Sequence, residues 1–251
     1  MRLPRGALVH NVFFRGAGCE APGTPEKTEL RKDDIVTDKK RLIAAAVINI
    51  IIFIVTAGIV VSYFFGNDGE YHIDPLGRFR LFTTDSNILC AVTSLIAAIC
   101  EIRILAGKSE ALPLWAQTLK YIGTVAVLLT FTVVVTFLGP TMGYIQMLFV
   151  GTSVYMHLLG PVLAFASFVF LEEGTKLAKR IIPLGALSIF IYGIYYLIRF
   201  VFIEPASSGW YDFYGFNIGG FWYISFIAVN LVGIGLAAVI RLLHNIKYRK
   251  R

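Results

Sequence analysis

The sequence predicts an all-α membrane protein, a bundle of six transmembrane helices with both termini in the cytoplasm. Hydrophobic residues make up 57% of the chain and charged residues only 16%, whereas soluble domains carry roughly 25% charged residues. The apolar residues gather into six runs, each close to the about 20 residues that cross a bilayer as a helix. Basic residues gather at the two ends of the chain and at or near every second connection between the runs.

The six runs follow one another without an internal repeat. They cover residues 42–65, 79–105, 114–138, 147–171, 181–203 and 220–243. The first is nearly pure Ile, Val and Ala, and the second is interrupted by the polar residues 83–87. Because Gly, Pro, Glu and Lys dominate residues 16–40, we expect a disordered basic cytoplasmic tail at 1–40. The membrane domain then covers 41–245, and a short basic tail covers 246–251.

The placement of basic residues gives the orientation. Nine Lys or Arg residues lie in the chain up to Arg41, and five lie from Arg241 onward. Further basic residues lie between spans two and three, with Lys120 just inside span three, and between spans four and five. On the opposite side the first loop has only Arg78 and Arg80, and the loops 139–146 and 204–219 have none. Because cytoplasmic loops are enriched in Lys and Arg, both termini are predicted inside. The basic residues lie in short clusters between apolar runs, which argues against nucleic-acid binding despite the net charge of +7.

Three of the predicted spans carry polar or small residues at helical spacing. These are Thr83, Asn87, Cys90 and Ser94 in span two; Ser153, His157, Gly160, Ala164 and Ser167 in span four; and Ser188, Tyr192, Tyr195 and Arg199 in span five. Packing between helices explains any one stripe, because small and hydroxylated residues favour close helix contact in lipid. The three stripes together predict a polar cavity that opens toward the outer side.

An ionisable residue inside a membrane span is energetically costly, so each one indicates a structural or functional role. His157 is the only histidine within a predicted span, since His10, His72 and His244 fall in tails or loops. Its imidazole suits a general base, a proton relay or a buried hydrogen-bond partner. The Asp85 carboxylate also needs a partner there. Arg199 is the candidate, because it lies at comparable depth in span five. Glu204 and Asp212 compete for the same arginine, and the Arg199 side chain could instead snorkel to the surface.

Aromatic residues are dense between positions 210 and 223. They suit an interfacial belt, because amphipathic rings settle at headgroup depth. They also suit a lid or lipid-entry rim over a cavity. The three cysteines, Cys19, Cys90 and Cys100, form no disulfide framework and are expected to be free thiols.

The segment Arg80-Leu-Phe-Thr-Thr-Asp-Ser-Asn87, followed later by His157-Leu-Leu-Gly-Pro161, resembles the androgen-induced membrane protein family and its uncharacterised bacterial six-span relatives. In this family a Phe-Thr or Leu-Thr pair opens the second span, and a histidine with a nearby proline lies in the fourth. The animal members are transmembrane threonine hydrolases that cleave fatty-acid esters of hydroxy fatty acids. The resemblance covers parts of spans two and four. The animal members also carry an Asn-His run before the key histidine, where this chain has residues 153–156.

The resemblance implies that Thr83 is the nucleophile and His157 the base. Thr84 is the alternative nucleophile, because two successive threonines leave the register open by one residue; Thr83 is preferred because it shares a helix face with Asn87. A threonine hydroxyl needs an adjacent base at neutral pH. Asp85 or Asn87 would orient the imidazole or stabilise an oxyanion. The remaining candidate substrate-binding residues are Tyr192, Tyr195 and Arg199.

The expected function is therefore hydrolysis of fatty-acyl esters that enter from the membrane lipids, with the plasma membrane as the expected location. Two other functions fit the same residues: a small-solute or proton channel or transporter that uses His157, Asp85 and Arg199, and a non-catalytic membrane scaffold. We expect no metal, since His157 has no second His or Cys at ligand spacing. We also expect no nucleotide cofactor, since no glycine-rich phosphate loop follows a strand.

Overall fold

A computed structural model describes residues 32–65, 75–203 and 212–248. It confirms the predicted fold class, because these residues form helices and no strand. Six helical stretches are long and apolar enough to cross a membrane: Lys39–Phe65, Phe82–Leu105, Leu114–Met142, Val154–Leu171, Lys179–Ile203 and Trp222–Ile246. Each coincides with one of the six predicted runs.

Several spans combine more than one type of helix. The first two are the single helices α1 (Lys32–Phe65) and α2 (Phe82–Leu105), with the 3-10 helix η1 (Pro75–Arg80) before α2. The third consists of α3 (Leu114–Val133), the π-helix η2 (Val134–Leu138) and α4 (Gly139–Met142), and the short α5 (Tyr144–Phe149) follows. The fourth consists of η3 (Val154–Leu159), α6 (Gly160–Ala166) and η4 (Ser167–Leu171). The fifth consists of η5 (Lys179–Ile181), α7 (Ile182–Gly185), α8 (Leu187–Tyr196) and η6 (Leu197–Ile203); η7 (Ile218–Gly220) then leads into the sixth, α9 (Trp222–Ile246).

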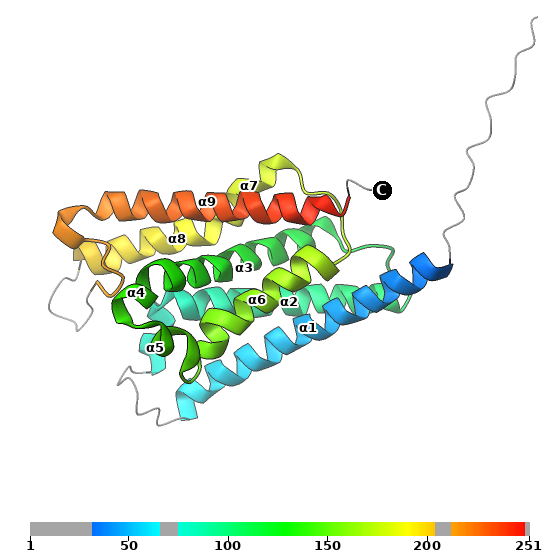
Figure 1. Cartoon of the computed structure of the whole chain (residues 1–251), viewed down its shortest axis with the longest axis horizontal. Coiled ribbons are helices and arrows are strands. Elements are labelled where there is room, and N and C mark those ends of the chain that lie inside the picture. Colours follow the sequence, from blue (N-terminus) through cyan, green and yellow to red (C-terminus); the bar gives the residue numbers. More distant parts are fainter. Residues whose placement is uncertain (1–31, 66–74, 204–211, 249–251) are drawn as a thin grey trace, which may run out of the picture.

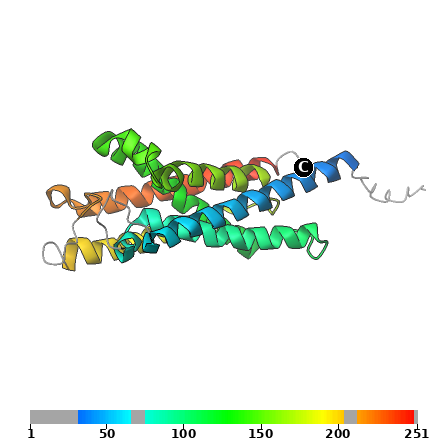
Figure 2. The same ribbon diagram turned by 90° about the horizontal axis from the view of Figure 1, so that it is seen from below.

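The start of α1 and the end of α9 lie at the same end of the bundle (Figure 1). We call this the inner end, because the basic residues predict that it faces the cytoplasm, and the opposite end the outer end. The short helices α4 and α5 project sideways at the outer end (Figure 2). Residues 32–40, part of the predicted tail, are helical, and residues 1–31 of that tail lie outside the described residues.

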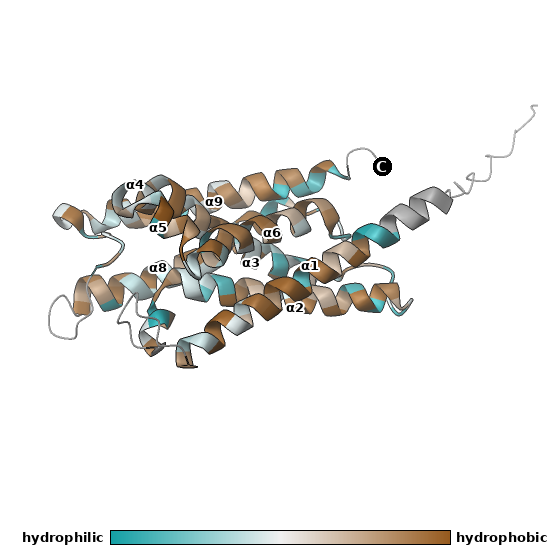
Figure 3. Cartoon of the chain, turned by 60° about the horizontal axis from the view of Figure 1, so that its bottom comes forward, coloured by the Kyte–Doolittle hydropathy of each residue, from teal (hydrophilic) through white to brown (hydrophobic). Residues whose placement is uncertain are grey.

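Large apolar side chains are exposed on the outside of the bundle, and the ribbons of the long helices are mostly brown, the colour of hydrophobic residues, in Figure 3. Ile54 is 60% exposed and Leu231 is 62% exposed. These side chains suit lipid, which is as apolar as they are, so helix association relies on close packing and hydrogen bonds between helices. Inside, Tyr121, Phe168 and Ile240 belong to one buried cluster that joins α3, η4 and α9.

The fourth span begins at Val154 rather than at the predicted residue 147. Gly151, with a φ of 53°, interrupts the helix between α5 and η3, and a side chain is strained at such an angle. Within the span, Pro161 has no N–H to offer the carbonyl four residues earlier, and its ring would clash with that carbonyl. The chain accommodates the proline by widening into the π-helix η3 directly before it.

The sixth span extends past the predicted residue 243 to Ile246, so it includes His244. The His244 side chain is fully buried. The prediction that His157 is the only histidine inside a span is therefore wrong. The error arose at a helix end, where an apolar pattern fades before the helix itself does.

Candidate functional site

Thr83 lies in the first turn of α2 and lines a cavity of about 430 Å³ in the outer half of the bundle. The cavity lies among α2, α3, η2, α8, the loop after residue 212 and α9. Most of its wall is apolar, with Val133, Phe137, Ile189 and Val229 among the lining residues. The sequence predicted a polar cavity at this place, and the cavity is instead mainly apolar with a few hydroxyl groups.

The hydroxyl groups of the cavity differ in their hydrogen bonds. Thr132 and Thr136 donate to carbonyls one turn earlier in their own helices, at 2.7 and 2.8 Å. Thr83 instead lies beside the Tyr214 hydroxyl, whose oxygen accepts the backbone N–H of Phe82 at 3.1 Å. Burial raises the pKa of the Tyr214 phenol to about 12, although the neighbouring Thr83 hydroxyl and the Phe82 N–H lower it in part.

Thr84 does not share this environment. Its side chain is 2% exposed, and it is not among the residues that line the cavity. A side chain one position along a helix points about 100° away, which explains why only one threonine of the pair reaches the cavity. Of the two predicted nucleophile candidates, Thr83 is therefore the one beside an open space.

His157 lies in η3 and is half-buried. Its Nδ1 is 2.6 Å from the backbone carbonyl oxygen of Met147. A carbonyl only accepts hydrogen bonds, so Nδ1 carries a proton and donates it there. In the neutral ring Nε2 then holds the lone pair, the form that a general base requires.

Asn87 joins the backbone segments that carry Thr83 and His157. Its amide nitrogen donates to the carbonyl of Thr83 at 2.8 Å and to the carbonyl of Met156 at 3.0 Å. Asn87 is 2% exposed, so both bonds are shielded from water. The amide nitrogen of Asn87 thus links the backbone at Thr83 to the backbone at Met156. The sequence predicted instead that Asn87 would orient the imidazole ring or stabilise an oxyanion.

The other predicted residues lie on a different side of α2. Asp85, Tyr192 and Tyr195 line a second cavity of about 470 Å³ between α2 and α8. Tyr192 also lines the Thr83 cavity, and its hydroxyl donates to the carbonyl of Arg80 at 2.6 Å. Tyr192 is therefore the one predicted binding residue that borders both spaces.

Arg199 lies in η6, one element beyond Tyr192 and Tyr195. Two other acidic residues were predicted to compete with Asp85 for Arg199. One of them, Glu204, lies outside the described residues. Asp212 accepts hydrogen bonds from the Tyr196 hydroxyl and from the backbone N–H groups of Phe216 and Asn217. Asp212 thus fixes the turn that places Tyr214 over the Thr83 cavity.

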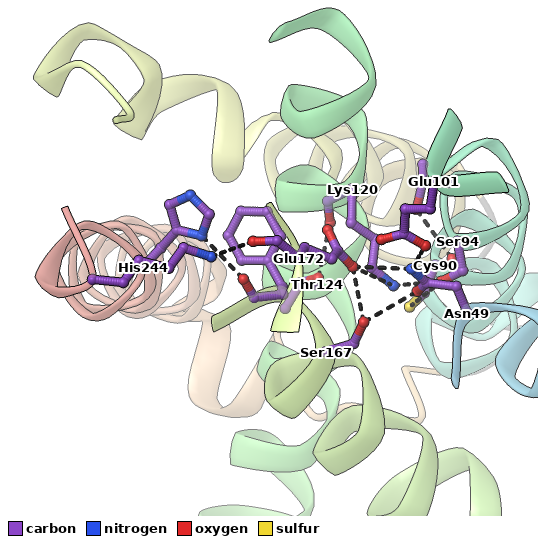
Figure 4. A network of polar contacts seen from close by, with 12 residues as sticks. Asn49, Cys90, Ser94, Glu101, Lys120, Thr124, Ser167, Glu172 and His244 are labelled. Atoms are coloured by element: carbon purple, nitrogen blue, oxygen red, sulfur yellow. Dashed lines mark hydrogen bonds and ion pairs between the residues drawn. The ribbon is translucent and has the colours of Figure 1, made fainter. Parts of the chain in front are cut away.

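The most polar part of the interior lies toward the inner end, where the sequence pattern predicted no site. Asn49, Ser94, Glu101, Lys120, Ser167 and Glu172 lie together there (Figure 4), each at most 1% exposed. We call these six residues the inner cluster. The Asn49 amide donates to Glu101 Oε2 and to Glu172 Oε1, both at 3.1 Å. Lys120 Nζ donates to Ser94 Oγ at 2.6 Å and lies 3.8 Å from Glu172 Oε1.

An extended segment, residues 172–178, covers the inner cluster. Gln117 of α3 binds it through the backbone N–H and carbonyl of Thr175, at 3.1 and 2.8 Å. Asn245 of α9 binds it in the same manner at Leu177, with both distances 2.9 Å. His244 adds a contact to Gln117, with 2.8 Å between the two side-chain nitrogens. These contacts keep Glu172 inside the bundle.

One sequence signal could have found the inner cluster. Glu101 and Lys120 both lie inside otherwise apolar runs, and ionisable residues within a span usually face the bundle interior and pair with each other. The position of Lys120 just inside span three instead indicates topology. The two residues that its side chain contacts, Ser94 and Glu172, lie on two other segments of the chain, which no local pattern connects.

Comparison with protein-family profiles, with curated proteins and with solved structures finds no match for this chain.

Proposed function

We propose that the protein is an intramembrane hydrolase of fatty-acyl esters, with Thr83 as nucleophile and His157 as base. The observation that carries the proposal is the position of the Thr83 hydroxyl, which borders an apolar cavity of about 430 Å³ beside the Tyr214 hydroxyl. An apolar cavity suits an acyl chain, and a few fixed polar groups suit the ester at one point of its wall.

The proposed reaction has two steps. Thr83 Oγ forms a bond to the acyl carbon while its proton passes to His157 Nε2, and the ester C–O bond then breaks as that proton passes to the leaving alcohol. In the second step the oxygen of a water bonds to the acyl carbon while one of its protons passes to His157. The bond between the acyl carbon and Thr83 Oγ then breaks as that proton passes to Thr83 Oγ, which releases the fatty acid. The Tyr214 oxygen already accepts the Phe82 N–H, so its own O–H is the donor we assign to the developing oxyanion.

His157 is not among the residues that line the Thr83 cavity, so the proposed pairing of Thr83 with His157 rests on two features of the structure around them. The Nδ1 contact to Met147 leaves Nε2 with the lone pair. Asn87 holds the backbone at Thr83 and at Met156 through one amide nitrogen, so the first turn of α2 lies against η3. Membership of the androgen-induced membrane protein family, a lipid-ester substrate and a plasma-membrane location belong to the same proposal.

Labelling with a fluorophosphonate probe tests the proposal. The purified chain in lipid should be labelled and should release fatty acid from an acyl ester. Thr83→Ala and His157→Ala should each abolish both signals. Thr84→Ala is the matched control, because it also removes a threonine hydroxyl, at the adjacent position, where the side chain is buried. The folded variant should keep both signals.

Two other results would each point to an alternative function. Solute or proton flux in proteoliposomes that survives Thr83→Ala but is lost in Asp85→Asn would indicate a transporter. The absence of labelling, turnover and flux in the folded wild-type chain would indicate a scaffold. Either result would contradict the proposed hydrolase.

A further inference from the structure

The inner cluster contains two carboxylate oxygens that lack a partner. Among the described residues, Glu101 Oε1 and Glu172 Oε2 are buried and accept no hydrogen bond. Buried polar atoms without a partner are rare, because each loses its hydration and gains nothing in return. Both side chains are at most 1% exposed. The cluster therefore has capacity for one more positively charged group.

The charges of the cluster lead to the same conclusion. Glu101 and Glu172 accept hydrogen bonds from one nitrogen of Asn49, so the two carboxyl groups are close neighbours. The charged groups that act on Glu101 are Glu172 and Lys120. One ammonium and two carboxylates leave one uncompensated negative charge in a region that water does not reach. An isolated charge there is costly, and the group takes up a compensating cation instead.

Further charged groups lie beside the cluster, outside its fully buried part. From α9, Lys247 donates to the backbone carbonyl of Glu172. At the surface, Arg41 of α1 pairs with Glu173 at 3.9 Å, and that pair is neutral as a whole. Asn49 of α1 and Ser167 of η4 are hydrogen-bonding groups without charge. Within the fully buried cluster, the charged groups are therefore Glu101, Glu172 and Lys120.

We propose that the inner cluster is a proton-binding site in which Glu101 carries the proton. Glu172 Oε1 accepts from Asn49 and from Ser167, at 3.1 and 2.9 Å, and lies 3.8 Å from the Lys120 ammonium. Those three groups stabilise Glu172 as the carboxylate. Among the described residues, the Glu101 carboxyl accepts a hydrogen bond only from Asn49, through Oε2. The proton therefore resides on Glu101 and leaves a neutral acid beside a Lys120–Glu172 ion pair.

A proton fits this place better than a metal ion. Nowhere in the described parts of the chain do three His, Cys, Asp or Glu side chains come together as they would around a metal. Metal ions also require several ligands at fixed distances, whereas a proton needs only one carboxylate oxygen. Glu101 lies toward the opposite end of α2 from Thr83, and the site shares no residue with the proposed hydrolase.

The inner end offers a route to solution. A cavity of about 500 Å³ is lined by Leu42, Ile104, Leu105 and Glu173. Ile104 and Leu105 follow Glu101 by one helical turn, and Glu173 directly follows Glu172. A proton that exchanges with the cytoplasmic side would therefore pass this cavity.

Infrared spectroscopy tests the proposal on the full chain in lipid. A protonated carboxyl group has a C=O stretching band that is distinct from carboxylate bands and shifts in D₂O. We expect wild type to show such a band at neutral pH, and Glu101→Gln to lose it. Glu173→Gln is the matched control, because it makes the same change at the adjacent surface pair with Arg41, and it should keep the band.

A second measurement does not depend on assigning the band. If the native cluster holds a proton that the unfolded chain releases, the ratio of folded to unfolded wild type falls as pH rises, by up to tenfold per pH unit. Glu101→Gln mimics the protonated acid and should remove this dependence, whereas Glu173→Gln should retain it. We would measure the unfolding midpoint between about pH 6 and 9, the range in which ordinary carboxylates no longer titrate.

Three results would overturn the proposal. One is a wild-type spectrum whose protonated-carboxyl band survives Glu101→Gln. Another is an unfolding midpoint with the same pH dependence in wild type and Glu101→Gln. The third is a midpoint that rises with sodium or potassium chloride, but not with choline chloride, and loses this response in Glu101→Gln, since a metal cation would then occupy the site.

Discussion

At the scale of single residues, Lys120 shows how buried charges depend on one another. Its side chain is fully buried, donates to Ser94 and pairs with Glu172. Lys120→Met keeps the aliphatic stem but removes the ammonium, which leaves a buried carboxylate without its counter-ion. Breaking a buried pair in this way costs about 3–5 kcal/mol. We expect a decrease of that size in the free energy of unfolding, measured by denaturant titration in mixed micelles.

The double variant Lys120→Met/Glu172→Gln separates charge from packing. Because it removes both members of the pair, it should regain most of the stability that the single variant loses. Lys40→Met is the control for the loss of a lysine at an exposed position of α1 and should change the unfolding free energy by less than about 0.5 kcal/mol. A double variant no more stable than Lys120→Met would contradict the assigned pairing.

At the scale of elements, α2 and α3 approach closely at Gly123. A Cβ atom there would lie 2.3 Å from Thr93 Oγ1 and 3.0 Å from the Cα of Cys90. Thr93 cannot turn away without losing its 3.0 Å hydrogen bond to the carbonyl of Cys90. We expect Gly123→Ala to separate the two helices and to destabilise the protein by about 1–3 kcal/mol, the usual cost of overpacking. Thermal unfolding in detergent would measure it.

Gly235 provides the matched comparison, because it is also helical and a Cβ atom there would meet nothing within 4 Å. Gly235→Ala should leave stability unchanged or raise it by up to about 1 kcal/mol, since alanine favours the helix more than glycine does. If the two variants unfolded at the same temperature, close contact at Gly123 would not be what holds α2 against α3.

The segment 172–178 is an element without regular structure that depends on side chains for its position. Asn245 is 6% exposed and satisfies both the N–H and the carbonyl of Leu177. Asn245→Ala leaves both groups unpaired, at a cost of about 1–3 kcal/mol for a buried group that loses its partner. We expect lower stability and faster proteolysis at this segment in the detergent-solubilised chain.

Asn230→Ala is the control for this change, because the Asn230 amide donates to the carbonyl of Phe226 one turn earlier in the same helix. Without the Asn230 amide, the Phe226 carbonyl still has the backbone N–H four residues later as its helical partner. We therefore expect little change in stability or proteolysis. Equal proteolysis of both variants would mean that Asn245 does not hold the segment.

These elements also show which features a sequence can predict. The six spans were predictable because each depends only on the local run of apolar residues. The break at Gly151 was not, because residues 147–153 read as part of the same run. The stripes of spans two and four include buried residues, namely Asn87, Cys90, Ser94 and Ser167. In span five, by contrast, Tyr195 is 39% exposed. Which residues meet across the bundle was not predictable. The Asn49 amide, for example, donates to residues 52 and 123 positions away.

At the scale of the whole molecule, the two polar regions lie in opposite halves of one bundle. The hydroxyl of Thr83 borders an apolar cavity in the outer half, and the inner cluster joins α1, α2, α3 and the end of η4 in the inner half. An apolar core that includes Tyr121, Val125 and Phe168 lies beside both. A lipid ester could thus reach one region from the membrane, while the other exchanges protons with the cytoplasm.

This arrangement requires the predicted orientation, which cysteine labelling in intact cells can test. Thr152 lies between α5 and η3 at the outer end, and Lys108 follows α2 at the inner end; both are exposed. In a background with Cys19, Cys90 and Cys100 replaced by alanine, we expect a membrane-impermeant maleimide to label Thr152→Cys directly. Lys108→Cys should react only after the membrane is permeabilised, because the basic residues retain that end in the cytoplasm. The reverse pattern would place the inner cluster on the outer side and remove the proposed route for cytoplasmic protons.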